Sequence, residues 1–394
     1  MSSVSAMARH FAFVANGGFA SSPLYTRLCA IVADDERLLD IAAHGRPGQQ
    51  PSNLLFAAVH FLLLGDSDLA GGRALAGGSN VTGASDSDLA GRNGPAGDAA
   101  PPALAAWYPS LAGTRRPDDP ELAGAFADFC LTRRSEIVGL VRHRLVQTNV
   151  VKRSALLRLG LSALAPELAG RPVTFLEVGA SSGIHLAFDR YRCRIGDRTF
   201  GPEHSPVVID TEWRSPLPVP TGTVRIVDRL GVDLNPVDMT DPVERRWLRA
   251  LVWPENHAQA ELLAAAALLV AESPARIVPG DAATVLARLD AELRTDMPLV
   301  VWHAATRAHV AADRRPAFDA AIAVLGRRRP LWTLSLETPD DDVDAWYARY
   351  GMCYALQLRA GTGDPRRLAA AHGHGDWVEP VDWPRASLDG QPAR

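Results

Sequence analysis

Residues 173–186, VTFLEVGASSGIHL, combine an apolar run, a turn of glycines and serines, and a helical pattern. Two kinds of chemistry use this shape. A glycine-rich turn after a strand lets the backbone approach a nucleotide-like ligand closely. The same turn also spells G-x-S-x-G from Gly179 to Gly183, which would make Ser181 the nucleophile of a hydrolase. The surrounding sequence has to separate the two interpretations.

The hydrolase interpretation requires strands before the nucleophile, because an earlier loop supplies half of the oxyanion hole. The sequence before residue 171 shows no strand pattern. A chain order of serine, aspartate and histidine can still be assembled in a protein with 11 histidines. That set would combine Ser181 with Asp340 or Asp341 and His372 or His374, and we keep it as an alternative.

Acidic residues follow three successive β-rich runs: Glu177 in LEVG, Asp233 in GVDLNP and Asp281 in PGDA. In an open parallel sheet these positions meet at one edge, where ligands bind. Asp233 could accept hydrogen bonds from ribose hydroxyls and Asp281 from an adenine amino group. Three carboxylates suit a donor-rich, phosphate-free ligand such as S-adenosylmethionine (SAM). NAD is disfavoured because the loop is not G-x-G-x-x-G and Asp233 follows Gly179 by 54 positions instead of about 20.

The elements that must position these acids divide the chain in two. Residues 1–168 carry helical periodicity, apart from a Gly-, Ala-, Ser- and Asp-rich stretch at 66–102 that we interpret as a loop. Residues 171–384 alternate β-rich and helical stretches, which predicts a mostly parallel sheet. An inserted hairpin or lid is expected at 192–223 and a tail at 385–394. The expected strands are 173–179, 224–236, 275–282, 298–304, 330–338, 354–361 and 376–381.

Composition excludes several classes of function. The net charge of −4 gives no electrostatic footprint for nucleic acid or an anionic membrane. The apolar run at 54–64 contains His60 and is too short to span a bilayer, so we expect a buried helix there. Four cysteines without a C-x-x-C pair suit a reducing compartment, and we expect a cytoplasmic protein that binds a small-molecule substrate.

The strings FLEVGASSG, GVDLNP and GDA resemble, in order and placement, the first three motifs of class I SAM-dependent methyltransferases. The chain also resembles an uncharacterised, largely actinobacterial family classed as a domain of unknown function. The resemblance covers nearly the whole chain and implies a Rossmann-like sheet of seven strands behind a helical N-terminal domain, with no established reaction. The strings that carry it are SPLY (22–25), NLLFAAVHFLL (53–63), QTN (147–149), LEVGASSGIHL (176–186), GVDLNPVD (231–238), WPE (253–255) and HG (374–375).

Three positions depart from those patterns. Ser181 stands where methyltransferase loops usually have glycine, and His185 and Val150 replace an asparagine and a glutamate that are common in the resembled family. Asn149 is expected to cap the helix over 151–168, with a ligand contact as the alternative. Together with the resemblance, the sequence predicts a cofactor-binding set of Glu177, Gly179, Ala180, Ser181, Gly183, Asp233, Leu234, Asp281, Ala282 and Asn149.

Methyl transfer needs mainly the positioning of donor and acceptor, with a general base when the acceptor carries a proton. His303, Glu337 and His185 are the predicted catalytic residues, and no metal is expected because His372 and His374 lack a third ligand. We therefore expect a SAM-dependent methyltransferase acting on a small molecule. The alternatives are aminocarboxypropyl transfer or cyclisation releasing methylthioadenosine, SAM binding without catalysis, and hydrolysis through Ser181.

Overall fold

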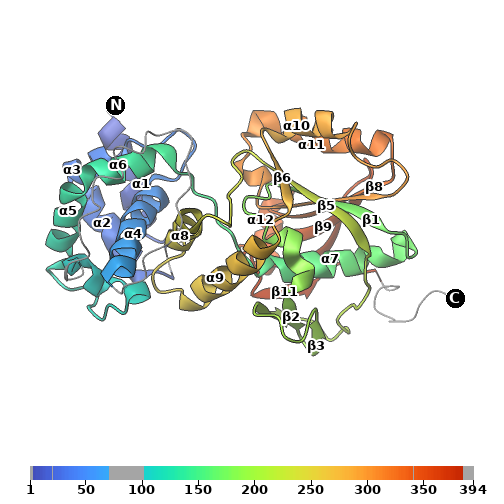
Figure 1. Ribbon diagram of the computed structural model, residues 1–394, viewed down its shortest axis with the longest axis horizontal. Helices are drawn as coiled ribbons and strands as arrows, with labels where there is room; N and C mark the ends of the chain where they lie inside the picture. The colour runs from blue at the N-terminus through green and yellow to red at the C-terminus, as the bar shows by residue number, and fades with distance from the viewer. Residues whose placement is uncertain (1–2, 20, 71–101, 340, 385–394) are drawn as a thin grey trace. The chain divides into compact units, whose positions relative to one another are not determined.

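The computed structural model describes residues 3–19, 21–70, 102–339 and 341–384 (Figure 1). Its chain forms two compact units. The helical unit comprises Met1–Thr148 and Thr240–Ala264, and the sheet unit comprises Asn149–Met239 and Ala265–Arg394. The expected division near residue 170 differs from this one at two places. Residues 149–168 group with the sheet, and residues 240–264 return to the helices.

Local capping explains where several helices of the helical unit begin. Ser22 accepts a hydrogen bond from the Tyr25 amide at the start of α2, and Pro23 occupies the first turn, where its missing N–H costs nothing. Asp35 caps α3 in the same way through the Arg37 amide. The helices that lie wholly in this unit are α1 (Ser3–Ala15), α2 (Pro23–Ala33), α3 (Glu36–Ala42), α4 (Pro51–Ala70), α5 (Leu122–Thr132), α6 (Arg134–His143) and α8 (Pro242–Ala250).

Helix α4 confirms that the apolar run at 54–64 is a buried helix. His60 is 1% exposed, and its ring nitrogens bond the Ala250 carbonyl and the Ser110 hydroxyl. Burial lowers the pKa of His60 to about 4, so the ring is neutral at pH 7. The helix continues to Ala70, into the start of the expected loop at 66–102; residues 71–101 lie outside the described residues, as does the tail at 385–394.

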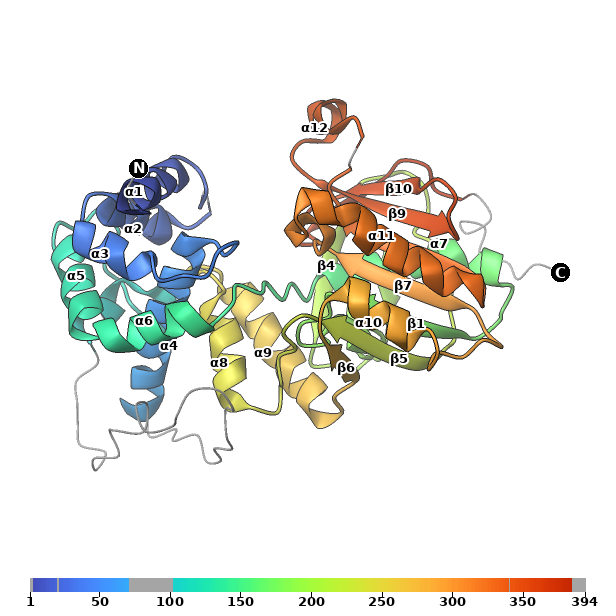
Figure 2. The ribbon, with the colours of Figure 1, turned by 90° about the horizontal axis from the view of Figure 1, so that it is seen from above.

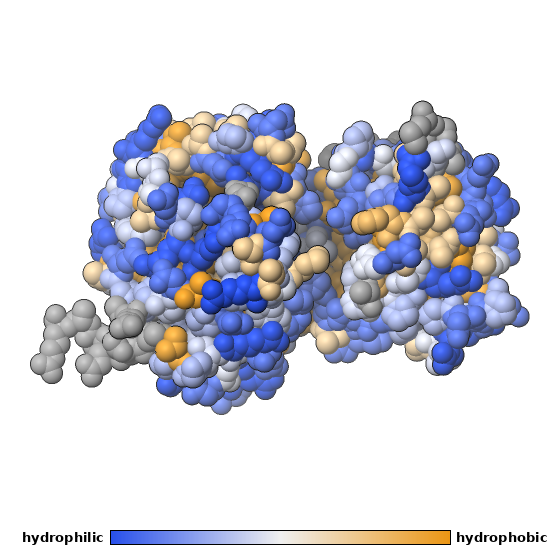
Figure 3. Space-filling model, turned by 180° about the vertical axis from the view of Figure 1, so that it is seen from behind, coloured by the Kyte–Doolittle hydropathy of each residue, from blue (hydrophilic) through white to orange (hydrophobic). Residues whose placement is uncertain are grey.

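No helix of the described ranges is both long and apolar enough to cross a membrane. On the face drawn in Figure 3, hydrophilic residues predominate and apolar residues form small groups between them. Helix α9 (His257–Glu272) follows α8 after a break at Trp253-Pro254, as the sequence predicts.

The sheet unit holds one sheet with the order β3-β2-β4-β11-β10-β9-β8-β7-β1-β5-β6. Its section β6-β5-β1-β7-β8 is parallel throughout, and the chain order reverses between β1 and β7. This is the arrangement of a doubly wound α/β fold, in which ligands bind beside the reversal at the carboxyl ends of the strands. We call that side of the sheet the carboxyl edge. Its strands are β1 (Val173–Val178), β5 (Ile226–Asp233), β6 (Arg276–Pro279), β7 (Leu299–Ala304) and β8 (Leu331–Glu337).

The α/β class is confirmed, but the sheet has eleven strands in place of the seven expected. The expected hairpin at 192–223 supplies three of them, and its last strand pairs with β11 in parallel, which joins the insertion to the main sheet. Strand β10 was not predicted, because its sequence RRLAAA has few of the residues favoured in strands. The remaining strands are β2 (Arg192–Ile195), β3 (Arg198–Phe200), β4 (Val208–Trp213), β9 (Tyr354–Ala360), β10 (Arg366–Ala371) and β11 (Trp377–Pro380).

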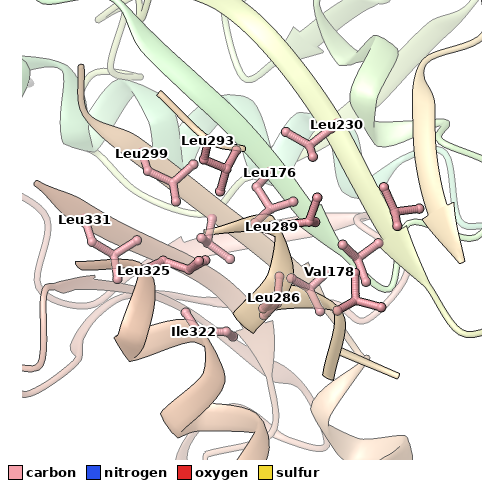
Figure 4. Close-up of a cluster of buried hydrophobic side chains, with 14 of the residues drawn as sticks. Leu176, Val178, Leu230, Leu286, Leu289, Leu293, Leu299, Ile322, Leu325 and Leu331 are labelled. Carbon is pink, nitrogen blue, oxygen red and sulfur yellow. The ribbon is translucent and has the colours of Figure 1, made fainter. Parts of the chain in front are cut away.

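Helices cover both faces of the parallel section. Figures 1 and 2 show α10 (Ala282–Leu289) and α11 (Arg315–Val324) on one face and α7 (Arg153–Leu168) on the other. Side chains alternate along β1, so Leu176 and Val178 enter the core under α10 and α11, which Figure 4 draws. Phe175 and Glu177 therefore face α7. The helix α12 (Val343–Tyr350) follows β8.

The core under α10 predicts a large cost for truncating Leu286, which is fully buried. Leu286→Ala removes buried apolar atoms and leaves a cavity, so we expect a loss of about 2–5 kcal/mol in the free energy of unfolding of the sheet unit. Urea denaturation followed by tryptophan fluorescence measures it. The matched control is Leu268→Ala in α9, where the side chain is 59% exposed. Equal effects of the two substitutions would contradict the assigned core.

Candidate functional site

The loop after β1, residues 179–183, is a tight turn that we call the glycine loop. Gly179 and Gly183 have φ values of +81° and +76°. A Cβ on Gly179 would lie 2.2 Å from Oγ1 of Thr306, which comes from the loop after β7. Ser181 also adopts a positive φ, +48°, which is uncommon for residues other than glycine. The glycine loop is therefore a strained turn pressed against the β7 loop across the point where the strand order reverses.

A short 3-10 helix, η3 (His185–Arg190), follows the glycine loop in place of the α-helix expected at 183–191. A 3-10 turn has no long row of aligned peptide dipoles. The arrangement therefore lacks the helix N-terminus that a Rossmann dinucleotide site offers to pyrophosphate. This agrees with the sequence argument against NAD.

Asn149 holds the glycine loop from the side of α7. Its Nδ2 donates to Ser181 Oγ at 3.1 Å, and its Oδ1 accepts from Ser182 Oγ at 2.5 Å. The prediction that Asn149 caps the following helix is wrong. Helix α7 begins at Arg153, and its N-cap residue is Lys152. The asparagine amide instead positions two consecutive serines of the turn.

Asp233 ties the glycine loop to β5. One carboxylate oxygen accepts from the Ser181 amide at 2.7 Å, and the other accepts from the Asn235 amide at 2.8 Å. The predicted ribose contact thus falls on a carboxylate that already binds two backbone amides. Leu234 is next in the chain and is 73% exposed, which is unusual for a leucine beside a buried strand end.

The loop after β6 joins the same edge through the Gly280 amide, which donates to the Asp233 carbonyl at 2.8 Å. Asp281 follows at the N-cap position of α10, but its exposed side chain makes no capping bond. Its nearest cation is Arg314, at 3.8 Å. Two residues predicted to contact the cofactor are directed into the protein instead. Ala282 packs against the core cluster, and Ala180 is 2% exposed.

Glu177 and His185 form a buried pair on the α7 face. His185 Nδ1 lies 2.8 Å from Glu177 Oε1, and its Nε2 lies 3.1 Å from the Val150 carbonyl. A carbonyl oxygen only accepts, so Nε2 carries a proton, and the Nδ1–Oε1 contact holds a second, shared proton. Burial raises the pKa of Glu177, although the neighbouring imidazole opposes the shift. Histidine therefore meets one oxygen of the Glu177 carboxylate, in place of the backbone amide or cationic ligand group that would be expected there, while Oε2 is buried without a hydrogen-bond partner among the described residues.

His303 and Glu337, predicted as catalytic residues on separate strands, form a second buried pair. His303 Nδ1 lies 2.8 Å from Glu337 Oε1, which also accepts from the amides of Thr306 and Arg307 at 2.9 and 3.0 Å. Burial raises the pKa of Glu337, but these hydrogen bonds outweigh it and leave the pKa lowered. Glu337 is thus an ionised anchor for the loop after β7.

The hydrolase interpretation receives no support from the placement of its residues. Among the described residues, Ser181 Oγ bonds Asn149 and no histidine. His185 already uses both ring nitrogens. Asp341 pairs with Arg367 at 2.6 Å, and Asp340 lies outside the described residues. His372 lies 2.8 Å from Asp376, away from the serine in the hydrogen-bond network.

Two small hollows on the sheet unit do not include the predicted cofactor residues. One, of about 170 Å³, lies at the opposite end of β1 and β5 and is lined by Arg158, Phe188 and Ile226 among others. The other lies between α11 and the β9–β10 turn. The case for a ligand at the carboxyl edge therefore rests on its exposed side chains and its loop contacts.

Three residues at the carboxyl edge were missed by the sequence prediction: Thr306, Arg153 and Tyr354. A signal existed for Arg153. Twelve residues of α7 are buried, and Arg153 is among them, so an arginine at the start of a mostly apolar helix was the available signal. Thr306 and Tyr354 carried no local signal, since their neighbours are distant in the sequence.

Comparison with known proteins gives one family match. The model of a family described as "Uncharacterized protein conserved in bacteria (DUF2332)" matches residues 89–380, which is most of the chain. No curated protein and no solved structure matches.

Asn149→Ala should loosen the glycine loop, because two serine hydroxyls lose their shared partner. We expect faster amide hydrogen exchange in the segment 179–186 and a stability loss of about 1–3 kcal/mol, measured by mass spectrometry and urea denaturation. Asn16→Ala is the matched control, since that exposed side chain bonds only its own helix carbonyl. Unchanged exchange in the loop would mean that Asn149 does not hold it.

Glu177 should make the sheet unit less stable as pH rises. Its folded pKa is raised, so the folded protein binds this proton more tightly than the unfolded chain does. Stability then falls as pH rises from the unfolded value of about 4.3 through the folded pKa. In Glu177→Gln the amide can donate to His185 Nδ1 at every pH, which removes this dependence.

The measurement is the difference in unfolding free energy between the wild type and Glu177→Gln across that pH range. Glu203→Gln serves as the control, because the Glu203 side chain is exposed. A difference that does not change with pH would show that Glu177 has an ordinary pKa.

Proposed function

We propose that this chain, which belongs to the DUF2332 family of uncharacterized proteins conserved in bacteria, binds SAM at its carboxyl edge and transfers the methyl group to a small molecule. One observation carries the proposal. The loops after β1, β5 and β6 are hydrogen-bonded into a single surface beside the reversal of strand order, and that surface exposes Leu234 and Asp281. We further propose that the parallel section β6-β5-β1-β7-β8 holds SAM as the sheet of a class I methyltransferase does.

The nucleoside half of SAM fits the exposed residues. Leu234 offers an apolar face for the adenine ring, and Asp281 offers an acceptor for its amino group. The positive φ values of Gly179 and Gly183 keep the loop narrow, so that a ligand can approach its backbone. Asp233 then acts mainly by fixing the loop geometry, since it already binds the amides of Ser181 and Asn235.

The methionine half fits less directly. Glu177 is 2% exposed and bound to His185, so it does not reach a ligand ammonium group. When bound, SAM supplies an activated methyl group on a sulfonium centre. The role of this chain is then to hold and orient donor and acceptor and to exclude water, which accounts for most of the catalysis in such displacements.

A second candidate function is SAM binding without catalysis. All three predicted catalytic side chains bind other groups of the protein. His185 binds Glu177, and His303 binds Glu337. Glu337 also accepts hydrogen bonds from two backbone amides. None is disposed as a base toward the exposed surface. Turnover separates the functions: methyl transfer leaves S-adenosylhomocysteine, aminocarboxypropyl chemistry leaves methylthioadenosine, and a binding protein leaves SAM intact.

Calorimetric titration of the purified protein with SAM and S-adenosylhomocysteine tests the cofactor. We expect micromolar binding of both, weakened about tenfold or more in Asp281→Asn through loss of a charged acceptor, and weakened in Leu234→Ala through loss of apolar contact. Asp197→Asn, in the exposed turn between β2 and β3, is the matched control. Asp233 is unsuitable for this test, because its removal also frees the glycine loop.

The absence of binding of either compound to the wild type would refute the proposal. Binding that is the same in Asp281→Asn and Asp197→Asn would place the cofactor elsewhere on the protein.

A further inference from the structure

Arg153 is a buried arginine that forms no ion pair with any carboxylate of the described residues. It is 7% exposed, and its Nε donates to the Gly373 carbonyl at 2.8 Å. The two Nη groups form no hydrogen bond with any described residue. An arginine carries five N–H donors, and Nε is the one with a partner here, so the donors on the two Nη groups remain available to another acceptor. Burial accordingly lowers the pKa of Arg153.

A second buried arginine in the same unit shows what a structural arginine looks like. Arg329 is 4% exposed and pairs with Asp290 at 2.6 Å. Its Nη groups also donate to backbone carbonyls of the surrounding chain. The protein therefore binds both Nη groups of Arg329 internally, although its Nε has no hydrogen-bond partner among the described residues. The end-on pair of Nη groups of Arg153 is instead left for another acceptor.

Two further polar side chains, those of Tyr354 and His374, lie near Arg153 and form no hydrogen bond with a described residue. The guanidinium carbon is 6.0 Å from the ring centre of Tyr354 at the start of β9. His374 follows Gly373 in the β10–β11 turn. Neither the Tyr354 hydroxyl nor the His374 ring forms a hydrogen bond with a described residue.

The turn that carries His374 is held firmly against the start of α7. Lys152 forms an ion pair with Asp376, and the Thr211 hydroxyl donates to the Gly375 carbonyl at 2.9 Å. Arg153 adds its bond to Gly373. These bonds fix the Nη groups of Arg153 and the turn of His374 in place, which lowers the entropic cost of ligand binding.

We propose that Arg153, Tyr354 and His374 form a subsite for the carboxylate group of a small-molecule ligand. The paired Nη groups match the two oxygens of a carboxylate, and a tyrosine hydroxyl can donate to one of them. Glu337 lies near enough for its charge to act on Arg153. A monoanion therefore suits the subsite better than a phosphate dianion, whose second charge would be repelled.

The subsite lies near the proposed SAM surface in the contact network. Glu337 holds the Thr306 amide at 2.9 Å, and Thr306 packs against Gly179 of the glycine loop. The ligand held by its carboxylate at this subsite would be the methyl acceptor, and that identification rests on the proposed function. Binding of a carboxylate by Arg153 stands or falls by itself.

The test uses the full chain without SAM, so its result is independent of the proposed function. Fluoroacetate is the probe, followed by ¹⁹F NMR line width, and fluoroacetamide is its uncharged counterpart. We expect fluoroacetate to bind and fluoroacetamide not to bind. Arg153→Gln keeps a donor for Gly373 and should weaken binding about tenfold or more. Tyr354→Phe should weaken binding several-fold through loss of one hydrogen bond.

Arg198→Gln is the matched control, because Arg198 is exposed on β3. Thermal melting checks that each variant is folded. If Arg153→Gln is unfolded, the binding of fluoroacetate to Tyr354→Phe decides the test. Three results would overturn the proposal: equal binding of the amide, unchanged binding in folded Arg153→Gln or Tyr354→Phe, or stronger displacement of the probe by inorganic phosphate than by acetate.

Discussion

The carboxylate of Asp233 is the contact on which the carboxyl edge depends. It accepts the Ser181 amide from the β1 loop and the Asn235 amide from its own loop, while its backbone carbonyl accepts Gly280 from the β6 loop. One residue therefore fixes three loops that are far apart in sequence. Ser181 has a positive φ, and the hydrogen bonds of its amide to Asp233 and of its hydroxyl to Asn149 offset the backbone strain at that residue.

Buried charges are met in three different ways around this edge. Glu177 shares a proton with His185, Glu337 gathers a histidine and two amides, and Arg329 pairs with Asp290. Each solution leaves the charge compensated within the protein, which is how buried ions are normally tolerated. Arg153 departs from this pattern.

The sequence predicted well what depends on local pattern. The strands of the parallel section, the buried helix at 54–64 and the break at Trp253-Pro254 follow from hydrophobic runs and proline positions. It also placed Glu177, Asp233 and Asp281 at one edge, because parallel strands end there. It did not predict their partners. Whether His185 or a ligand meets Glu177 is decided by tertiary distance, and the alanine-rich β10 pairs through its backbone alone.

The pairing of β4 with β11 has a consequence for how the chain is made. Glu212 and Trp213 find their partners Trp377 and Val378 only far downstream in the sequence. During synthesis from the N-terminus, β2 can pair with β3 and with β4, but the other side of β4 has no strand beside it until β11 emerges. The ribosome-bound intermediate thus carries an open strand edge, the kind of surface on which nascent chains associate wrongly. The pairing of β11 with β4, which closes that edge, is therefore a late step in the biogenesis of the protein.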